Sequence, residues 1–402
     1  MIDKETFIRV PYGMSVHGDE EIEAVVKVLK SSTQMGEHVM NLEGKIAAFF
    51  NKNFGIMVNS GSSALLLAFE ILDLPKDSEV ITPALTFSTT VSSIIKSGLV
   101  PSFVDVNKDT YCINTKKIEE MITTKTKAIC VPNLIGNLAD WPAIKKIADK
   151  NGLIVIEDSA DTLGGSIDKK SSGYFSDISI TSFYGSHVVN GAGNGGMLCL
   201  NNSDYYQKAK LLRSWGRSSS LFKDSEAIEN RFNVNLEGIE YDAKFVFESA
   251  GYNLEPSEIS AAFALIQLKN LDINIEKRIS NFEKQIKFFS NYKDFFSLPI
   301  QLPNSKTGWL AFPFIVKDSA PFKRRDLQIY LEKRNIQTRV VFTGNINRQP
   351  GFKDILKKIN NEGYPESDYV MRGGMLIACH HGLTSEMINH VHQSIRSFLM
   401  RF

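Results

Sequence analysis

The sequence predicts an α/β fold with two lobes, and three observations support this prediction. The chain has 402 residues, which exceeds the length at which single hydrophobic cores usually divide. Hydrophobic residues make up 43% of the chain, as is ordinary for a globular enzyme. In the first half, short apolar runs alternate with segments of helical periodicity. This alternation indicates crossover units and a largely parallel sheet covered on both faces.

The first half contains apolar runs of a length typical of buried strands, at 80–82, 102–105, 128–131, 153–156, 178–181 and 197–200. Helical periodicity is expected between them, at 118–122 and 143–148. Each run therefore predicts one strand of the central sheet.

The second half predicts a smaller lobe. Residues 218–247 are polar and are expected to form an irregular insertion. A long helical stretch should run from Glu255 toward Phe289 and bridge the lobes. Strands are expected near 309–316 and 338–342, and a helix near 386–398. We therefore predict a large α/β domain over 1–265, including the N-terminal segment, and a small α+β domain over 266–402.

Charge and composition exclude several classes of partner. The chain carries 46 Lys and Arg against 45 Asp and Glu, so no net field favours nucleic acid or an acidic membrane. No apolar run approaches the ~18–20 residues that span a bilayer, and the first residues do not resemble a signal peptide. Four widely spaced cysteines favour a reducing cytoplasm and argue against a zinc site or disulfides: Cys112, Cys130, Cys199 and Cys379.

Two segments have the character of ligand sites. Gly61 and Ser62 precede the strong helix former 64–68, and small residues at a helix N-terminus can leave backbone N–H groups for a phosphate. A plain serine cap is the alternative. Asp158 ends an apolar run, so it should lie at the carboxyl edge of the sheet where ligands gather. For this residue, a helix cap is the alternative.

The segment 181–187 runs from a predicted strand into a turn and ends at His187. A glycine-rich stretch, 191–196, follows it. A single histidine is more often structural than catalytic. With an ordinary pKa of ~6.5, however, it is largely neutral at pH 7 and able to take a proton.

Together with Gly-Tyr-Asn at 251–253, these segments resemble the DegT/DnrJ/EryC1/StrS family of sugar aminotransferases, which use pyridoxal phosphate. The resemblance runs from about Pro11 to the end of the chain. It implies the fold of a fold type I pyridoxal-phosphate-dependent transferase, with a three-layer, cofactor-binding large domain around a mostly parallel mixed sheet. It also implies a homodimer with shared active sites.

The resemblance assigns the cofactor-binding residues. Phe87 would stack on the pyridine ring, Asp158 would keep the ring nitrogen protonated, and Asp161 would lie near the ring hydroxyl. The phosphate would be held by three residues of one subunit and one of its partner: Gly61, Ser62 and Ser182, with Asn253 reaching across.

His187 occupies the position of the family's catalytic lysine, so the cofactor would be held without a covalent bond. Two branches of the family have a histidine at this position, and both are nucleotide-sugar 3-dehydratases. One uses an iron–sulfur cluster on cysteines in the insertion before Gly-Tyr-Asn. Here no cysteine lies between Cys199 and Cys379, and a cluster needs about four thiolates. The other branch, which resembles GDP-4-keto-6-deoxymannose 3-dehydratase, uses pyridoxamine 5'-phosphate with glutamate and no cluster.

The resemblance thus implies a lyase of deoxysugar and lipopolysaccharide O-antigen biosynthesis. It would remove the C3 hydroxyl of a nucleotide-linked 4-keto-6-deoxyhexose, and L-glutamate would restore the cofactor amine. The nucleotide stays open, because 338–350 looks closer to the CDP-sugar branch and Asn194 replaces a usual glutamate. Two alternatives remain: an aminotransferase with an atypical base, and a catalytically silent dimer that retains a cofactor pocket.

Overall fold

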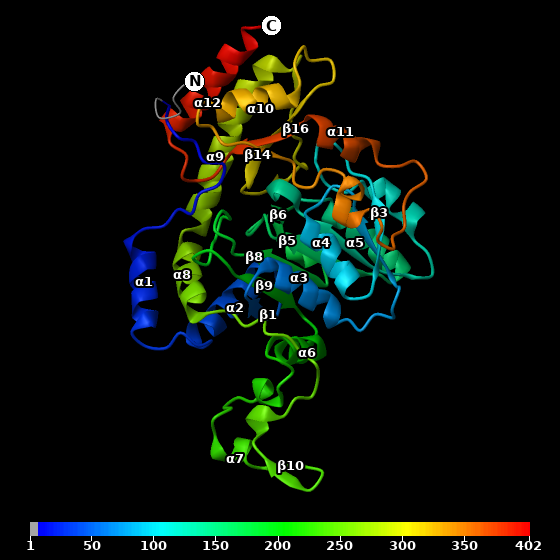
Figure 1. Cartoon of the computed structure of the whole chain (residues 1–402), viewed down its shortest axis with the longest axis vertical. Coiled ribbons are helices and arrows are strands. Elements are labelled where there is room, and N and C mark those ends of the chain that lie inside the picture. The colour runs from blue at the N-terminus through cyan, green and yellow to red at the C-terminus, as the bar shows by residue number, and fades with distance from the viewer. Residues whose placement is uncertain (1–6) are drawn as a thin grey trace.

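The computed structural model describes residues 7–402 and has a central seven-stranded sheet (Figure 1). Its strand order is β1-β9-β8-β5-β4-β2-β3, and only β9 runs antiparallel to its neighbours. In chain order the strands are β1 (Phe54–Val58), β2 (Glu79–Pro83), β3 (Val100–Val104), β4 (Thr126–Pro132), β5 (Ile154–Ser159), β8 (Ile178–Ser182) and β9 (Gly196–Leu200). The predicted α/β class and the six predicted strands are confirmed.

Helices cover both faces of this sheet, which gives the predicted three layers. On one face lie α3 (Gly61–Glu70), α4 (Ser88–Lys96) and α6 (Ser203–Arg213). On the other lie α2 (Glu37–Phe49), α5 (Trp141–Asn151) and α8 (Glu258–Lys269). Neighbouring residues of one strand enter opposite layers: Ile56 packs with α3, whereas Met57 packs with α2. Burial on both faces explains why the strands are almost continuously apolar.

One predicted helix is wrong. Of residues 118–122, only Glu119–Met121 form a helical turn, a short 3₁₀ turn that follows another at Thr115–Lys117, and the helical periodicity is not continued. The backbone becomes extended at Ile122 and β4 begins at Thr126, so there is no room for a further helical turn. By contrast, the helix expected at 143–148 is confirmed as part of α5, which ends at Gly152 in the left-handed conformation.

The smaller lobe is built on a four-stranded antiparallel sheet with the order β12-β14-β16-β15. Its strands are β12 (Phe296–Ser297), β14 (Ala311–Val316), β15 (Arg339–Val340) and β16 (Gly374–Ala378). The flanking helices are α10 (Arg324–Glu332), α11 (Pro365–Gly373) and α12 (Ser385–Leu399). The strand at 309–316 and the helix at 386–398 are confirmed, but only two residues of 338–342 are in a strand.

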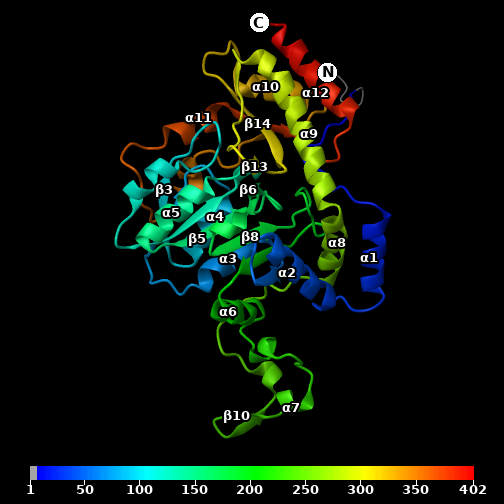
Figure 2. The same cartoon turned by 180° about the vertical axis from the view of Figure 1, so that it is seen from behind.

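The long helical stretch is divided in two. It breaks at Asn270 between α8 and α9 (Leu271–Phe289), and α9 then runs into the smaller lobe (Figures 1 and 2). Residue 265 lies inside α8, so the division of the chain at 265 stays a prediction. Helix α1 (Asp19–Leu29) packs along α8 on the side of the body.

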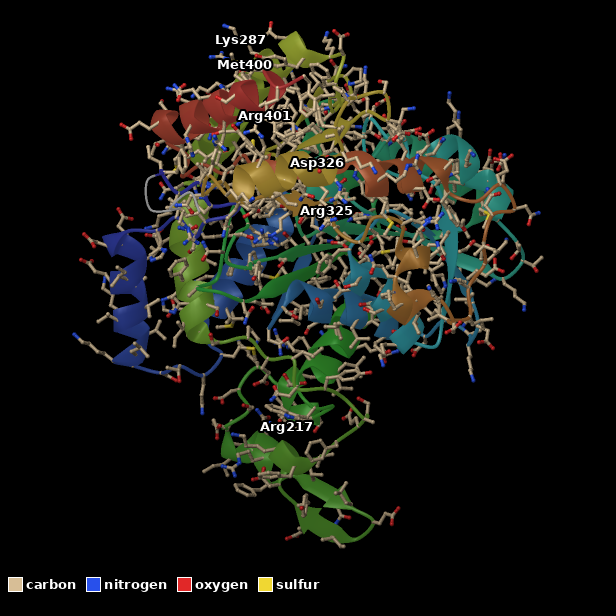
Figure 3. All side chains as sticks on the ribbon, turned by 45° about the horizontal axis from the view of Figure 1, so that its top comes forward. Arg217, Lys287, Arg325, Asp326, Met400 and Arg401 are labelled. Carbon is tan, nitrogen blue, oxygen red and sulfur yellow. The ribbon has the colours of Figure 1, made fainter. Side chains whose placement is uncertain are left out.

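Residues 218–247 form an arm that extends away from the body, with Arg217 at its base (Figures 1 and 3). The arm is less irregular than predicted, because it contains α7 (Ile228–Arg231) and a hairpin of β10 (Val234–Leu236) and β11 (Ile239–Tyr241). Both residues of the hairpin turn, Glu237 and Gly238, have positive φ, which matches the twist of the strands. Several of its large apolar side chains are exposed: Ile228, Phe232, Leu236, Ile239, Tyr241, Phe245 and Phe247.

The four cysteines are free thiols that lie in four separate hydrophobic clusters. Within residues 7–402, no group of three His, Cys, Asp or Glu side chains is arranged to hold a metal ion. Over the same residues, no helix is long and apolar enough to cross a membrane. The cytoplasmic location and the lack of an iron–sulfur cluster stay predictions.

A buried carboxylate connects two helices beneath the sheet. Glu258, at the start of α8, accepts backbone N–H bonds from Gly36, His38 and Val39 at 3.1, 2.6 and 3.1 Å. These groups form the N-terminus of α2, whose N-cap Gly36 has no side chain to cap it. A negative charge at this position satisfies the free donors and interacts favourably with the helix dipole.

We expect Glu258→Gln to lower the free energy of unfolding by about 1–3 kcal/mol, because a neutral amide with one acceptor oxygen replaces a carboxylate with two. Urea denaturation measures the change. Glu23→Gln, at an exposed position of α1, serves as the control and should stay within about 0.5 kcal/mol of the parent. Equal stability of both variants would contradict a capping role for Glu258.

Candidate active site

A cavity of about 530 Å³ lies at the carboxyl ends of the parallel strands, where the two lobes meet. The large lobe contributes the ends of β4, β5 and β8 together with the start of α3. The smaller lobe contributes residues near β14, β15 and β16. The cavity brings together most of the site residues predicted from the sequence: Gly61, Ser62, Phe87, Asp158, Asp161, Ser182 and His187. Asn253 does not line it.

One end of the cavity is formed by the first turn of α3. Ser60 caps this helix by accepting the Ser63 N–H at 3.1 Å, so the serine cap and the ligand-facing turn are present together. A Cβ atom on Gly61 would lie 2.7 Å from the Cβ of Ser182. The turn therefore packs directly against the end of β8, which places Ser182 beside the helix N-terminus. A tetrahedral anion would find both backbone and hydroxyl donors there.

The loop between β8 and β9 carries His187. It is held by backbone bonds from Phe183 N to Gly195 O at 2.9 Å and from Gly191 N to Phe183 O at 2.8 Å. The His187 Nδ1 atom lies 3.1 Å from the Ser182 carbonyl oxygen. Because a carbonyl can only accept, Nδ1 carries the proton and Nε2 keeps its lone pair. Nε2 is 3.7 Å from Asp161 Oδ1.

Burial lowers the pKa of His187 to about 4, the Ser182 carbonyl opposes this effect, and the positive charge of Arg278 adds to it. The imidazole is therefore neutral at pH 7. A neutral imidazole whose Nε2 lone pair is not used in a hydrogen bond to the protein is competent as a proton acceptor.

Asp158 lies at the end of β5 and is only 5% exposed. Its two carboxylate oxygens accept bonds from Thr90 Oγ at 2.9 Å and from Ala160 N at 3.1 Å. Burial raises the pKa of Asp158 to about 6, although both hydrogen bonds act in the opposite direction. A mostly ionised, buried carboxylate is a strong acceptor for a protonated ring nitrogen.

Asp161 lines the same cavity and accepts the Ile135 N–H at 2.9 Å. Burial raises its pKa to about 7, the bond from Ile135 opposes this effect, and the charge of Asp158 adds to it. Ile135 itself is buried with a φ of 63°, which is rare and costly for a β-branched residue. The strained backbone directs its N–H at the carboxylate.

Phe87 lines the cavity, whereas Asn253 lies outside it, at the base of the arm. Phe87 precedes α4, is 48% exposed, and makes an edge contact with Phe342 of the smaller lobe. It is therefore an aromatic surface of the cavity that protein atoms do not cover. Asn253 pairs with Ser214 at the base of the arm, and its carbonyl accepts a bond from Asn59 Nδ2 at 3.5 Å.

The cavity contains residues that the sequence analysis did not assign to it. Tyr12, Tyr184 and Arg339 line it, and the Arg339 guanidinium lies 5.3 Å from the Tyr12 ring centre. Tyr12 comes from the N-terminal segment, and no local sequence signal places that segment at the sheet edge. The motif around Arg339 was noted in the sequence, but only as a mark of the family branch.

Residues 16–396 match the model of the DegT/DnrJ/EryC1/StrS aminotransferase family. The chain belongs to this family. The predicted fold of a fold type I pyridoxal-phosphate-dependent transferase is thereby confirmed.

Curated relatives include several 3-dehydratases. The chain is 32% identical to a dTDP-4-dehydro-2,6-dideoxy-D-glucose 3-dehydratase of Saccharopolyspora spinosa, over 97% of this chain and 86% of the relative. It is 30% identical to a GDP-4-keto-6-deoxy-D-mannose 3-dehydratase of Escherichia coli, over 93% of this chain and 96% of the relative.

The solved structure of an E. coli GDP-4-keto-6-deoxy-D-mannose-3-dehydratase with bound hydrated PLP superimposes with a TM-score of 0.88. The two chains are 27% identical, over 96% of this chain and 99% of that one. Another structure of a GDP-4-keto-6-deoxymannose-3-dehydratase, with a trapped PLP–glutamate geminal diamine, has a TM-score of 0.86. It is 26% identical, over 96% of this chain and all of that one.

We expect Thr90→Val to raise the pKa of Asp158 further above about 6, because the hydroxyl that stabilises the carboxylate is lost while the carboxyl group stays buried. Carbon-13 NMR of aspartate-labelled protein follows the titration. Ser92→Ala on the same helix is the control and should leave the titration unchanged. An unchanged titration in Thr90→Val would show that the Thr90 bond is not formed in solution.

Proposed function

We propose that this chain is a 3-dehydratase that removes the C3 hydroxyl of a nucleotide-linked 4-keto-6-deoxyhexose and gives a 4-keto-3,6-dideoxysugar. We further propose pyridoxamine 5'-phosphate as its cofactor and L-glutamate as the donor that restores the amine. The observation that carries this proposal is His187, neutral and with Nε2 unused, in a cavity whose described lining contains no lysine. The 3-dehydratase relatives support the same reaction class.

The residues of the cavity fit such a cofactor. Gly61 allows the first turn of α3 to approach Ser182 closely, so that backbone N–H groups and the Ser182 hydroxyl lie together, which suits a phosphate at the start of α3. Asp158 presents a buried carboxylate that would accept a bond from a pyridinium nitrogen, and Asp161 would lie near the ring hydroxyl. Phe87 offers an aromatic face. When bound, the cofactor would supply an amine for the sugar ketone and a ring that accepts electrons.

The protein's own groups would move the proton. His187 Nε2 would act as the base and take up a proton from the cofactor carbon that carries the amine. The Ser182 carbonyl accepts the Nδ1–H bond and fixes the orientation of the ring. The imidazolium would then return the proton to the leaving hydroxyl, acting as acid after base. Asp161, 3.7 Å from Nε2, would stabilise the imidazolium in its ionised form. Burial of the site limits competing exchange with water.

The proposal includes a homodimer with shared active sites. Asn253 lies outside the cavity of its own subunit, at the base of the arm, and would reach the cofactor phosphate of the partner. Two other readings are kept as alternatives: a sugar aminotransferase with an atypical base, and a dimer that binds cofactor without catalysis. The aminotransferases of the same family favour the first.

The deciding assay incubates the protein with pyridoxamine 5'-phosphate, L-glutamate and one 4-keto-6-deoxyhexose linked to GDP, CDP or dTDP. Mass spectrometry of the sugar product separates the three readings. A net loss of one oxygen atom, with a keto group retained at C4, supports the proposal, because the C3 hydroxyl is replaced by hydrogen and the cofactor amine supplies the two electrons. An amino group at C4 with the C3 hydroxyl retained favours the aminotransferase. No change with any of the three substrates favours the silent dimer. The same comparison identifies the nucleotide.

We expect His187→Lys to lose 3-dehydration by at least about 100-fold, since general base catalysis contributes roughly that much or more. The new amine should also bind pyridoxal phosphate covalently, which borohydride reduction and mass spectrometry detect. His187→Asn is the matched control, because it should lose dehydration and gain no covalent bond. Dehydration by the lysine variant at the parental rate would show that His187 is not the base.

We expect Asn253→Ala to weaken pyridoxamine 5'-phosphate binding about tenfold to a hundredfold, because one charge-assisted bond of about 1.5–3 kcal/mol is lost. Fluorescence titration measures this affinity. Heterodimers of Asn253→Ala with His187→Ala should regain activity, because one of their two composite sites has both residues intact. Verified subunit exchange without regained activity would contradict a shared site.

A further inference from the structure

Arg278 of α9 is a fully buried arginine at the junction of the two lobes, and it does not line the cavity. Its Nη1 donates to the carbonyl oxygens of Trp309 at 3.0 Å and Leu310 at 3.2 Å. Its Nη2 lies 3.5 Å from the carbonyl oxygen of Ser186, the residue before His187. One side chain thus connects the helix of the smaller lobe to the loop that carries the proposed base.

The third nitrogen of the guanidinium, Nε, faces His381 Nδ1 at 3.3 Å. The imidazole must accept here, because an arginine can only donate. His381 Nε2 is buried and has no hydrogen-bond partner among the described residues. Burial of His381, together with the charge of Arg278, lowers the pKa of His381 to about 3. His381 is therefore neutral and does not repel the guanidinium.

The charge of Arg278 is not neutralised by a carboxylate. None of the ion pairs among residues 7–402 includes it, although a buried charge is normally paired. Burial lowers its pKa only to about 10, so it is charged at neutral pH. Cys379, Tyr12 and Asp161 are the groups around it that favour its charged form.

The groups on which this charge acts come from every element around the junction. It lowers the pKa of His187 in the loop, and those of His380 and His381 after β16. It acts in the same direction on Asp161, where it opposes the effect of burial. An unpaired cation at this point favours neutral histidines and an ionised Asp161, which is the combination that a base at His187 needs.

We propose that Arg278 is a positioning residue for His187: its guanidinium anchors the loop through the Ser186 carbonyl, and its unpaired charge adds to the effect of burial in favouring the proton-accepting form of the imidazole. The role of His187 as base rests on the proposed function, whereas the effect of Arg278 on the His187 imidazole does not. A purely structural arginine would tie the lobes together and leave the protonation of His187 unchanged.

Two substitutions separate the two parts of the proposal. Arg278→Gln removes the charge and retains hydrogen-bond donors, whereas Arg278→Lys retains the charge and loses the planar group that reaches several carbonyls at once. Arg324→Gln on α10 is the control, because Arg324 donates to the Arg372 carbonyl and Gln328 away from the cavity. Histidine NMR titration and the pH profile of kcat/KM are measured for each. The His187 signal is assigned by its absence in His187→Asn.

In Arg278→Gln, removal of the positive charge should raise the pKa of His187 in the NMR titration. In the holoenzyme, where the cofactor pyridinium would keep Asp158 ionised, the acidic limb of kcat/KM should move to higher pH with it. In Arg278→Lys, the limb should stay at its parental pH while kcat falls about tenfold, because the loop is less well held. The control should match the parent in both measurements.

The proposal is overturned if His187 titrates at the parental pH in Arg278→Gln, or if Arg278→Lys retains the parental kcat. Should the glutamine variant not fold, the lysine variant decides alone: a parental limb with reduced kcat supports the proposal, and a shifted limb contradicts it. A shifted NMR titration with an unmoved kcat/KM limb would support the action of Arg278 on His187 and contradict His187 as the base. Failure of the Arg278 proposal and failure of His187 as the proposed base therefore give different results.

Discussion

The site depends on the pairing of Ser182 with Gly196, where β8 and β9 lie antiparallel at the edge of the cavity. A Cβ atom on Gly196 would lie 2.3 Å from the Ser60 carbonyl oxygen, so only glycine allows this approach. The same close packing joins the start of α3 to the end of β8 through Gly61. Three chain segments therefore converge within van der Waals contact. Any larger residue here would separate the anion-binding turn from the loop that carries His187.

Burial of the convergence point has one electrostatic consequence for its ionisable groups. It raises the pKa values of Asp158 and Asp161 and lowers that of His187, so each moves toward its neutral form. The two carboxyl groups differ because Thr90 and Ala160 both donate to Asp158, whereas Asp161 receives only the Ile135 N–H. At neutral pH the cavity thus holds one carboxylate that is mostly ionised, Asp158, and one that is closer to half protonated, Asp161.

The sequence predicted the layers of the large lobe and most of the cavity, because these features leave local marks. Buried parallel strands appear as apolar runs, and their carboxyl ends carry Asp158 and Ser182. The motif spacing placed His187 in the cavity. By contrast, β16 was not predicted, although its five residues are all buried. Its short apolar run does not distinguish strand from helix without its partner β14.

The other omissions are of long range. Tyr12 reaches the cavity because the N-terminal segment pairs with the smaller lobe at Val10 and Ile336, far apart in the sequence. Arg278 lies within an amphipathic helix as one more basic residue, and only the packing of two lobes buries it. The arm was predicted as polar, since its exposed aromatics are scattered between charged residues. Tertiary packing decides these positions.

The reactivity of the four buried cysteine thiols reports on the unfolding of the chain. Burial raises the pKa of Cys112 and Cys379 to about 12 and raises those of Cys130 and Cys199 as well, so the reactive thiolate is scarce in the native state. Because each thiol belongs to a different hydrophobic cluster, the rate at which one thiol is alkylated reports when that cluster alone becomes exposed. The order in which the four react with a small alkylating reagent would give the order in which the layers and lobes come apart.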